Sequence, residues 1–378
     1  MQRLSGREKV ASDHRWRIGA SFWPAYTPAM DKTPEKQLRR GWTTGACATA
    51  AVKAALVRLW GGAFAADVTI TLPRGETPTF ALAHTDAGAT WAEAGITKDA
   101  GDDPDVTHGA LIIARVRQGG QGIVFQAGKG VGMITKPGLP IPPGEPAINP
   151  APRQMMTSVV QDLAAEYGRP AHVEITISIP GGEALAAKTW NPRLGIVGGL
   201  SVLGTTGIVR PFSCSAWIAS IHRGVDVARA CETPHVAGCT GATSEAAVQR
   251  LYGLPDHAML DMGDFAGGLL KYLAKHPVAR VTIGGGIGKM TKLAQGARDL
   301  HSGRSQVDFD QLADWLQDDR LRYVNTALEA YEIAGKTLPA MIAEKARDQV
   351  RIMLKDAPVD ADIVVIDRAG AIIAQAGP

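Results

Sequence analysis

The sequence has few cysteines and no long apolar run. Its four cysteines form no CxxC pair and no cysteine/histidine cluster, which argues against a structural zinc site and against a disulfide framework. Scattered thiols are typical of a reducing compartment, so we expect a cytoplasmic protein. No stretch approaches the ~20 apolar residues needed to span a bilayer, and we expect no membrane partner.

The sequence also carries little net charge. Its 378 residues include 40 Lys and Arg against 37 Asp and Glu, a net charge of +3, without a dense basic stripe. This balance argues against a nucleic-acid partner and is compatible with an anionic small ligand. The length is sufficient for two domains, and whether the chain forms a homo-oligomer is left open.

Residues 1–37 differ in composition from the rest of the chain. They mix tryptophans, prolines and small residues without a sustained apolar core, which is a poor match to a signal peptide. We expect residues 1–37 to form a disordered N-terminal extension.

Residues 38–190 predict an α+β domain with a mixed or antiparallel sheet. An alanine-rich helix is expected from about Thr44 to Trp60, and Gly61-Gly62 provides its stop signal. Short alternating strands separated by turns follow, and Pro150–Tyr167 predicts a second helix. Strands joined by short turns favour antiparallel or mixed pairing.

Residues 191–378 predict a Rossmann-like α/β domain. A helix capped by Ser213, with Trp217 among its apolar positions, precedes three strand–loop–helix units. The loops of these units read GCTGATSE, DMGDFAGG and GGGIGK. Strands that alternate with helices predict a doubly wound parallel sheet with a ligand at the carboxyl ends of its strands. Three further helices are expected, over Phe309–Leu316, Leu321–Ile333 and Pro339–Leu354.

The stretch Gly195–Pro211, which reads GIVGGLSVLGTTGIVRP, lies where these two patterns meet. Glycines let a backbone approach a ligand closely, and Arg210 carries a planar cation suited to carboxylates. We interpret the stretch as a ligand-facing turn. We expect Gly207→Val to abolish function and to leave the fold largely intact.

An acidic loop interrupts the strands of the first domain. Lys98–His108 reads KDAGDDPDVTH, and its carboxylates and imidazole suit a hard cation or a general base. The spacing does not fit an EF-hand, and a solvated acidic loop is the ordinary alternative.

The glycine loops match no single nucleotide motif. GGGIGK lacks the earlier glycine and the Ser/Thr of a phosphate-binding Walker A loop, and Lys289 stands where a GxGxxG fingerprint needs glycine. Asp261-Met262-Gly263 is similar to the acidic turn of many S-adenosylmethionine enzymes, but Phe265 stands where that turn has its second glycine. The residues alone predict an α/β enzyme with an anionic or nucleotide-like ligand.

Longer motifs are more specific. LRRGWTTGACATAA at Leu38–Ala51, DAGDDPDVTHG at Asp99–Gly109, ITKPGLPIPPGEPAINPAPRQM at Ile134–Met155 and KTWNPRLGIVGGLSVLGTTGIVRP at Lys188–Pro211 occur in this order. Together they resemble the cobalt-precorrin-5B C(1)-methyltransferase (CbiD) family of anaerobic cobalamin biosynthesis. GDFAGGLLKYL and GGGIGKMTKLAQGARDLHS also resemble that family's second half.

The resemblance implies a reaction and its reactants. A methyl group passes from S-adenosyl-L-methionine, the cosubstrate, to carbon 1 of a cobalt-tetrapyrrole substrate, giving cobalt-precorrin-6A and S-adenosylhomocysteine. No protein-bound metal is required, because the substrate carries the cobalt.

The same resemblance guides the expected site. Substrate carboxylates are expected at Thr43, Thr44, Gly45, Lys136, Thr205, Thr206, Gly207 and Arg210. The donor is expected at Gly238, Thr240, Gly241, Gly263, Asp264, Gly284, Gly285, Gly286 and Gly288. Because they cluster, Asp103, Asp105 or His108 is the candidate to take or relay a proton.

Two alternatives stay open. An NAD(P)-dependent reductase of the same pathway would use the same α/β half, although the GxGxxG fingerprint is absent. A non-catalytic tetrapyrrole-binding protein would need carboxylate contacts and no donor site. Binding of S-adenosylhomocysteine, of NADPH or of neither separates the three.

Overall fold

An alanine-rich helix forms the centre of the N-terminal half in the computed structural model, which describes residues 38–377. The expected N-terminal extension lies outside these residues. Helix α1 (Thr44–Gly61) begins at Thr43, whose side chain accepts a hydrogen bond from Ala46 N, and ends at Gly62 with φ of 91°. Its small side chains permit close packing on two sides, against helix α2 (Pro150–Glu166) and against a sheet. The predicted start and end of α1 are confirmed.

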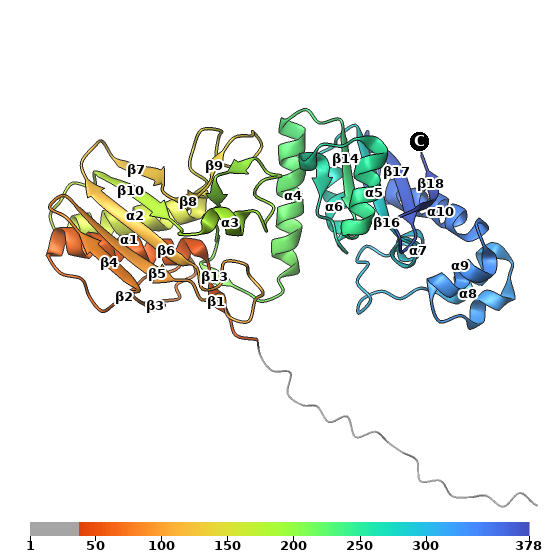
Figure 1. The fold of residues 1–378 in the computed structure, drawn as a ribbon, viewed down its shortest axis with the longest axis horizontal. Helices are drawn as coiled ribbons and strands as arrows, with labels where there is room; N and C mark the ends of the chain where they lie inside the picture. The colour runs from red at the N-terminus through yellow and green to blue at the C-terminus, as the bar shows by residue number, and fades with distance from the viewer. Residues whose placement is uncertain (1–37, 378) are drawn as a thin grey trace, which may run out of the picture. The chain divides into compact units, whose positions relative to one another are not determined.

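The sheet of this half has five strands in the order β4-β5-β6-β10-β7. These are β4 (His84–Ala87), β5 (Trp91–Thr97), β6 (Leu111–Gln118), β10 (Val173–Ser178) and β7 (Ile123–Ala127). Only β10 and β7 pair in parallel, so the predicted mixed sheet is confirmed. Buried and less buried residues alternate along β6 and β10, as expected for a sheet that packs its core on one face. The helices α1 and α2 cover that face (Figure 1).

Residues 195–211 belong to the N-terminal half by their strand pairing. Three short strands in this stretch each pair with an earlier strand of this half. The pairs are β11 (Ile196–Val197) with β9 (Met133–Ile134), β12 (Gly199–Leu200) with β8 (Gly130–Val131), and β13 (Ile208–Val209) with β1 (Gly41–Trp42). The pattern therefore changes after Pro211, and we propose the division between the halves there rather than at residue 190.

The C-terminal half contains a second five-stranded sheet, in the order β15-β14-β16-β17-β18. Its strands are β14 (His235–Cys239), β15 (Met259–Leu260), β16 (Arg280–Gly286), β17 (Asp360–Ile366) and β18 (Ile372–Ala376). The first four run parallel, as the alternation of strands and helices predicts, and β18 is antiparallel.

Helices cover both faces of this sheet. Along β17, Ile363 joins the core under α6 (Ala266–Leu273), α7 (Ile287–Ala294) and α10 (Thr337–Leu354), whereas Val364 faces α5 (Ala242–Tyr252). A strand buried on both sides needs a continuous apolar run, and Ile363–Ile366 supplies one.

The remaining elements are shorter or lie at the edges of the two halves. They are β2 (Asp67–Thr69), β3 (Thr79–Ala81), α3 (Gly182–Ala186), α4 (Cys214–Ala230), η1 (Asp256–Ala258), α8 (Phe309–Leu316), η2 (Asp319–Tyr323) and α9 (Ala327–Ala334). Ser213 caps α4 as predicted, by accepting a hydrogen bond from Ala216 N.

Two local predictions are wrong. Gly284–Gly286 continue β16 rather than forming a loop, because glycine there leaves room for helix side chains such as Val248 and Met290. The expected helix over Leu321–Ile333 is divided into η2 and α9, since the Thr326 side chain accepts a hydrogen bond from Glu329 N and starts a new helix.

Two glycines of residues 195–211 test the close packing of this stretch. Gly198 and Gly207 have φ of 86° and 80°, but a Cβ would meet open space at Gly198 and lie 2.5 Å from Leu72 Cδ2 at Gly207. We expect Gly198→Ala to cost about 1–2 kcal/mol of unfolding free energy through backbone strain. Gly207→Ala should cost about 1–3 kcal/mol more, because buried Leu72 must move.

Urea unfolding of both variants measures this difference. Equal losses would contradict the packing argument. The expectation that Gly207→Val leaves the fold largely intact is revised by the same contact, since a larger side chain increases the clash with Leu72.

Candidate functional site

The carboxyl ends of the parallel strands meet a cavity of about 440 Å³. This edge is where doubly wound sheets bind ligands. The lining comes from the ends of β14, β16 and β17 and from the start of α9, and includes Thr240, Gly286, Gly288, Lys289, Thr326, Tyr331 and Asp367. Apolar and polar groups therefore converge at the predicted edge of the sheet.

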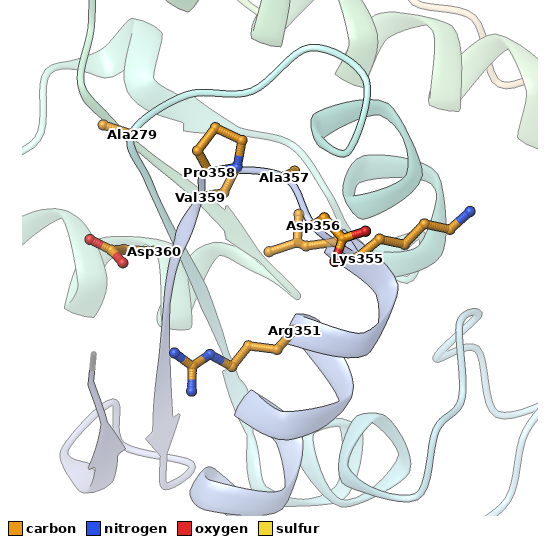
Figure 2. Close-up of a pocket in the computed structure, with 9 residues that line it drawn as sticks. Ala279, Arg351, Lys355, Asp356, Ala357, Pro358, Val359 and Asp360 are labelled. Carbon is orange, nitrogen blue, oxygen red and sulfur yellow. The ribbon is translucent and has the colours of Figure 1, made fainter.

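A larger cavity of about 590 Å³ lies at the other end of the same strands. Figure 2 shows its lining, which comes from the end of α10 and the start of β17 and includes Arg351, Lys355, Asp356 and Asp360. Because it lies at the amino end of β17, none of the glycine-bearing loops reaches it. We therefore take the cavity at the carboxyl ends as the candidate site.

Lys289 joins two loops beside the 440 Å³ cavity. Its Nζ lies 2.6 Å from Asp264 Oδ1, in the loop after β15, and 3.4 Å from the carbonyl oxygen of Thr240, which follows β14. Asp264 is thus held by an ion pair, and Lys289 keeps a side chain that is 39% exposed. The pair links the loop after β15 to the start of α7, beside the cavity.

The nine predicted donor residues separate into three groups of three. Thr240, Gly286 and Gly288 line the cavity, whereas Gly238, Gly284 and Gly285 are buried within strands. A Cβ would lie 2.5 Å from Leu269 at Gly238, 2.6 Å from Val248 at Gly284 and 2.8 Å from Met290 at Gly285. These three glycines serve the close packing of helices on the sheet, which corrects their prediction as donor contacts.

The other predicted donor residues lie in the loops. Gly241 is exposed and precedes α5, Asp264 pairs with Lys289, and Gly263 lies next to Trp217. At Gly263 a Cβ would be 3.6 Å from Trp217 Cζ2. Their contact with a donor stays a prediction.

Asp261, directly after β15, is the most perturbed carboxyl at this edge. Burial, and next the charge of nearby Glu245, raise its pKa to about 6, although a hydrogen bond from Trp190 and the charge of Arg193 act in the opposite direction. A carboxyl that titrates near neutral pH can exchange a proton during catalysis. The sequence pointed to Asp261 only as part of a glycine turn, because its neighbour Glu245 comes from α5 and Trp190 from the other half of the chain.

Arg193 links the loop before β11 to this edge. Its Nη2 lies 2.5 Å from Glu245 Oε1, and its Nη1 donates to the Met259 carbonyl oxygen at 3.2 Å. The guanidinium stacks on the ring of Trp190 at 4.4 Å. These contacts bring a segment of the N-terminal half to the strand ends of the C-terminal half, a connection that local sequence patterns do not contain.

Each predicted catalytic residue of the acidic loop accepts a hydrogen bond from a different part of this chain. Asp105 accepts hydrogen bonds from Lys98 Nζ and, at 2.7 Å, from Thr107 N. Asp103 accepts one from Phe212 N at 2.8 Å, and His108 Nδ1 accepts one from Ala100 N at 3.1 Å. Within residues 38–377, no three His, Cys, Asp or Glu side chains gather as a metal site.

Asp105 is a structural anchor by its environment. Burial alone would raise its pKa, but the charge of Lys98 and hydrogen bonds from Lys98 and Thr107 outweigh burial and lower it. Lys98 is only 3% exposed. A carboxylate with a lowered pKa and a buried cation as its partner is a weak base, so its predicted proton role is not favoured.

The residues predicted for substrate carboxylates are mostly engaged within the chain. Thr43 N donates to Gly207 O at 2.9 Å and Gly45 N to Leu203 O at 2.8 Å, so these amides at the start of α1 have protein partners. Thr44 is buried. Capping and packing thus account for these residues without a ligand.

Of the other residues predicted for carboxylates, two are paired and two are exposed. The Nζ of Lys136 lies 2.9 Å from His257 Nδ1, and Thr206 Oγ1 accepts from Ile208 N at 3.3 Å. Thr205 and Arg210 are exposed. They are the members of the predicted set that stay free to meet a carboxylate, and their role stays a prediction.

The sequence of this chain is similar to known proteins over most of its length. Residues 31–211 match the CbiD family model, and residues 299–377 match the model of the CbiD C-terminal domain. The cobalt-precorrin-5B C(1)-methyltransferase of Brucella anthropi is 58% identical over 363 residues, which cover 92% of this chain and 99% of that protein. The chain belongs to the CbiD family. A protein of the same name from Brucella canis is also 58% identical, over 92% of this chain and 98% of its own.

A solved member of the CbiD family is more distant. The crystal structure of the cobalamin biosynthesis protein CbiD from Archaeoglobus fulgidus is 24% identical, covers 79% of this chain and 85% of that chain, and has a TM-score of 0.39. Of the helices between residues 38 and 377, none is long and apolar enough to cross a membrane.

The ion pair of Asp105 with Lys98 makes a stability prediction. Asp105→Asn leaves a buried, uncompensated cation, so we expect a loss of about 3–5 kcal/mol in unfolding free energy. His108→Ala, in the same loop but with a side chain that is 53% exposed, should stay within about 0.5 kcal/mol of the unmodified protein. Urea unfolding measures both.

A double variant separates charge burial from other effects of this change. Lys98→Met with Asp105→Leu removes both charges and should recover most of the lost stability. If Asp105→Asn is as stable as the unmodified protein but cannot turn over substrate, Asp105 is catalytic and the anchor interpretation is wrong.

The raised pKa of Asp261 predicts a pH effect on stability. Its pKa of about 6 exceeds the ordinary value of 3.8, so its stabilising contribution is complete below pH 3.8 and is lost as the pH rises through 6. Between pH 4 and pH 7, Asp261→Asn should avoid a loss on the order of 1 kcal/mol, a value discounted for partial solvent exposure. Urea unfolding across this range measures the loss, with Asp67→Asn at an exposed strand position as the control. Parallel stability curves for the unmodified protein and Asp261→Asn would contradict the prediction.

Proposed function

We propose that this protein transfers a methyl group from S-adenosyl-L-methionine to carbon 1 of cobalt-precorrin-5B, in cobalamin biosynthesis. The observation that carries the proposal is the 58% identity to proteins named for this reaction, which extends over 92% of the chain. The products are cobalt-precorrin-6A and S-adenosylhomocysteine, and the route is the anaerobic one. The enzyme class is a C-methyltransferase.

We propose that the C-terminal half is Rossmann-like and that the donor binds at the carboxyl edge of its sheet. In the order β15-β14-β16-β17, the chain turns from one side of β14 to the other between β15 and β16, which is the kind of position where such sheets bind ligands. The 440 Å³ cavity opens there and is lined by Thr240, Gly286 and Gly288. We propose that these residues contact the donor, and that Lys289 with Asp264 holds the surrounding loops.

The reaction requires mainly that the methyl donor and carbon 1 of the substrate are aligned. The electron pair at carbon 1 forms the new bond to the methyl carbon while the carbon–sulfur bond breaks and its electrons stay on sulfur. S-adenosylmethionine supplies an activated methyl group, so the chain must hold the two reactants close and in line and exclude water. Asp261 is placed to exchange a proton near this edge, and exposed Arg210 and Thr205 to meet substrate carboxylates.

We place the reaction in the cytoplasm on the basis of the cysteines. All four are free thiols, and Cys47 and Cys239 are buried, which raises the pKa of each to about 12. Buried thiols of this kind are unreactive and give the reaction no nucleophile. Methyl transfer directly from sulfur to carbon needs none.

The donor cavity offers a matched pair of variants. At Gly286, φ is −69° and a Cβ meets no atom within 4 Å, so a larger side chain projects without backbone strain. Gly286→Leu should fill part of the cavity and weaken S-adenosylhomocysteine binding by about tenfold or more, whereas Gly286→Ala should change it by less than about threefold. Calorimetry measures both affinities. Each variant loses the same glycine at the start of α7, so the comparison isolates the size of the side chain.

Turnover tests the reaction itself. The unmodified protein, given cobalt-precorrin-5B and S-adenosylmethionine labelled in its methyl group, should release S-adenosylhomocysteine and yield a product with one labelled methyl group. Binding of NADPH without S-adenosylhomocysteine would support a reductase instead. Binding of neither, with no product, would overturn the proposal in favour of a carrier. Equal affinity in the two Gly286 variants would exclude the cavity but not the reaction.

A further inference from the structure

The start of α4 exposes an unusual amount of aromatic surface. Among residues 38–377, three aromatic side chains are strongly exposed, and two of them stand here: Phe212 at 65% and Trp217 at 46%. The sequence predicts Trp217 as part of a packed apolar face, and its exposure is a correction. The two residues flank the first turn of α4, and apolar groups exposed on one part of a surface often mark a binding site.

Capping of α4 does not explain this exposure. Phe212 precedes the cap residue Ser213, and Trp217 is the fourth residue of the helix. Apolar residues at these two positions often pack on each other and fix the path of the chain into a helix. Such a contact would cover both rings, yet both stay open to solvent.

Both residues are held in place by hydrogen bonds from other loops. Phe212 has a φ of 54°, which costs a non-glycine residue energy, and its N–H is bound to Asp103 Oδ1 at 2.8 Å. The indole Nε1 of Trp217 donates to the Asp261 carbonyl oxygen at 2.8 Å. The ring of Phe265 lies 6.2 Å from that of Trp217, tilted by 52°. The backbone of Phe212 is thus tied to the acidic loop, and the ring of Trp217 to the loop after β15.

Cations flank the same surface. Arg210 is exposed two residues before Phe212. Arg304, paired with Asp299, is 51% exposed, and its Nη2 lies 3.0 Å from Cys214 Sγ in the first turn of α4. Flat apolar rings bordered by guanidinium groups complement a flat ligand that carries carboxylates at its rim.

We propose that Phe212, Trp217 and Phe265 form an aromatic platform on which one face of the cobalt-tetrapyrrole macrocycle packs. Arg210 and Arg304 bind carboxylates at the rim of the macrocycle. This inference rests on the proposed function, because its occupant is the substrate of that reaction. The hydrogen bond from Trp217 to Asp261 places the indole beside the loop that follows β15, at the carboxyl end of the sheet.

Cobyrinic acid, a cobalt corrin with free carboxylates, is the probe for the platform. Calorimetry with the full-length protein should show Trp217→Leu binding it about tenfold more weakly or worse, because the aromatic face is lost. Trp217→Phe keeps a ring and loses the indole N–H, so it should retain most of the affinity. Tyr323→Leu, at an aromatic side chain that is 83% exposed elsewhere, should bind as the unmodified protein does.

Phe212→Leu repeats the test at a position whose side chain packs little, so folding is less at risk. With cobalt-precorrin-5B as substrate, Trp217→Leu and Phe212→Leu should raise KM by a similar factor and leave S-adenosylhomocysteine affinity within about threefold. Unchanged corrin affinity and unchanged KM in both variants would overturn the platform while leaving the proposed function in place. If the unmodified protein transfers no methyl group to cobalt-precorrin-5B, the proposed function is overturned, and the platform with it.

Discussion

The close approach of residues 195–211 to the start of α1 is the contact on which much of the structure depends. Thr43 N and Gly45 N donate to the carbonyl oxygens of Gly207 and Leu203, and at Gly204 a Cβ would lie 2.1 Å from Thr43 Oγ1. Backbones can meet at this distance only where a side chain is absent. The contact uses the amides that an anion would need. The chain then leaves this contact toward α4, and Arg210 is exposed just before α4 begins.

Long-range ion pairs give the carboxyl edge its chemical character. Lys289 joins the loops after β14 and β15, and Arg193 brings the N-terminal half to Glu245. Asp261 lies among these groups, partly buried and close to another carboxylate, which is why its pKa is raised. In the acidic loop the balance is reversed, because Asp105 faces a buried lysine, its pKa is lowered, and it acts as an anchor. The two carboxyl groups differ in function because they differ in neighbours.

Much of the fold follows from local patterns. Ser213 caps its helix as predicted and Thr43 caps α1, because a side-chain oxygen and a nearby amide are sufficient for a cap. The parallel sheet follows from the regular alternation of strands and helices, which allows few connections. The glycines of GGGIGK were misread as a loop, since glycine also occurs where a helix packs directly on a strand. Local composition does not separate these two uses.

The sequence by itself determined the family, the order of the elements and the class of reaction, because long motifs and short-range periodicity are properties of neighbouring residues. Only the tertiary structure decided which of the predicted residues are free to act. Lys98 forms an ion pair with Asp105, and Lys136 lies within hydrogen-bond distance of His257. Leu269 of α6 packs against Gly238. Trp217 likewise bonds to a residue 44 positions away, Asp261, and stays exposed. Burial, pairing and pKa depend on partners distant in sequence, and folding alone brings those partners together.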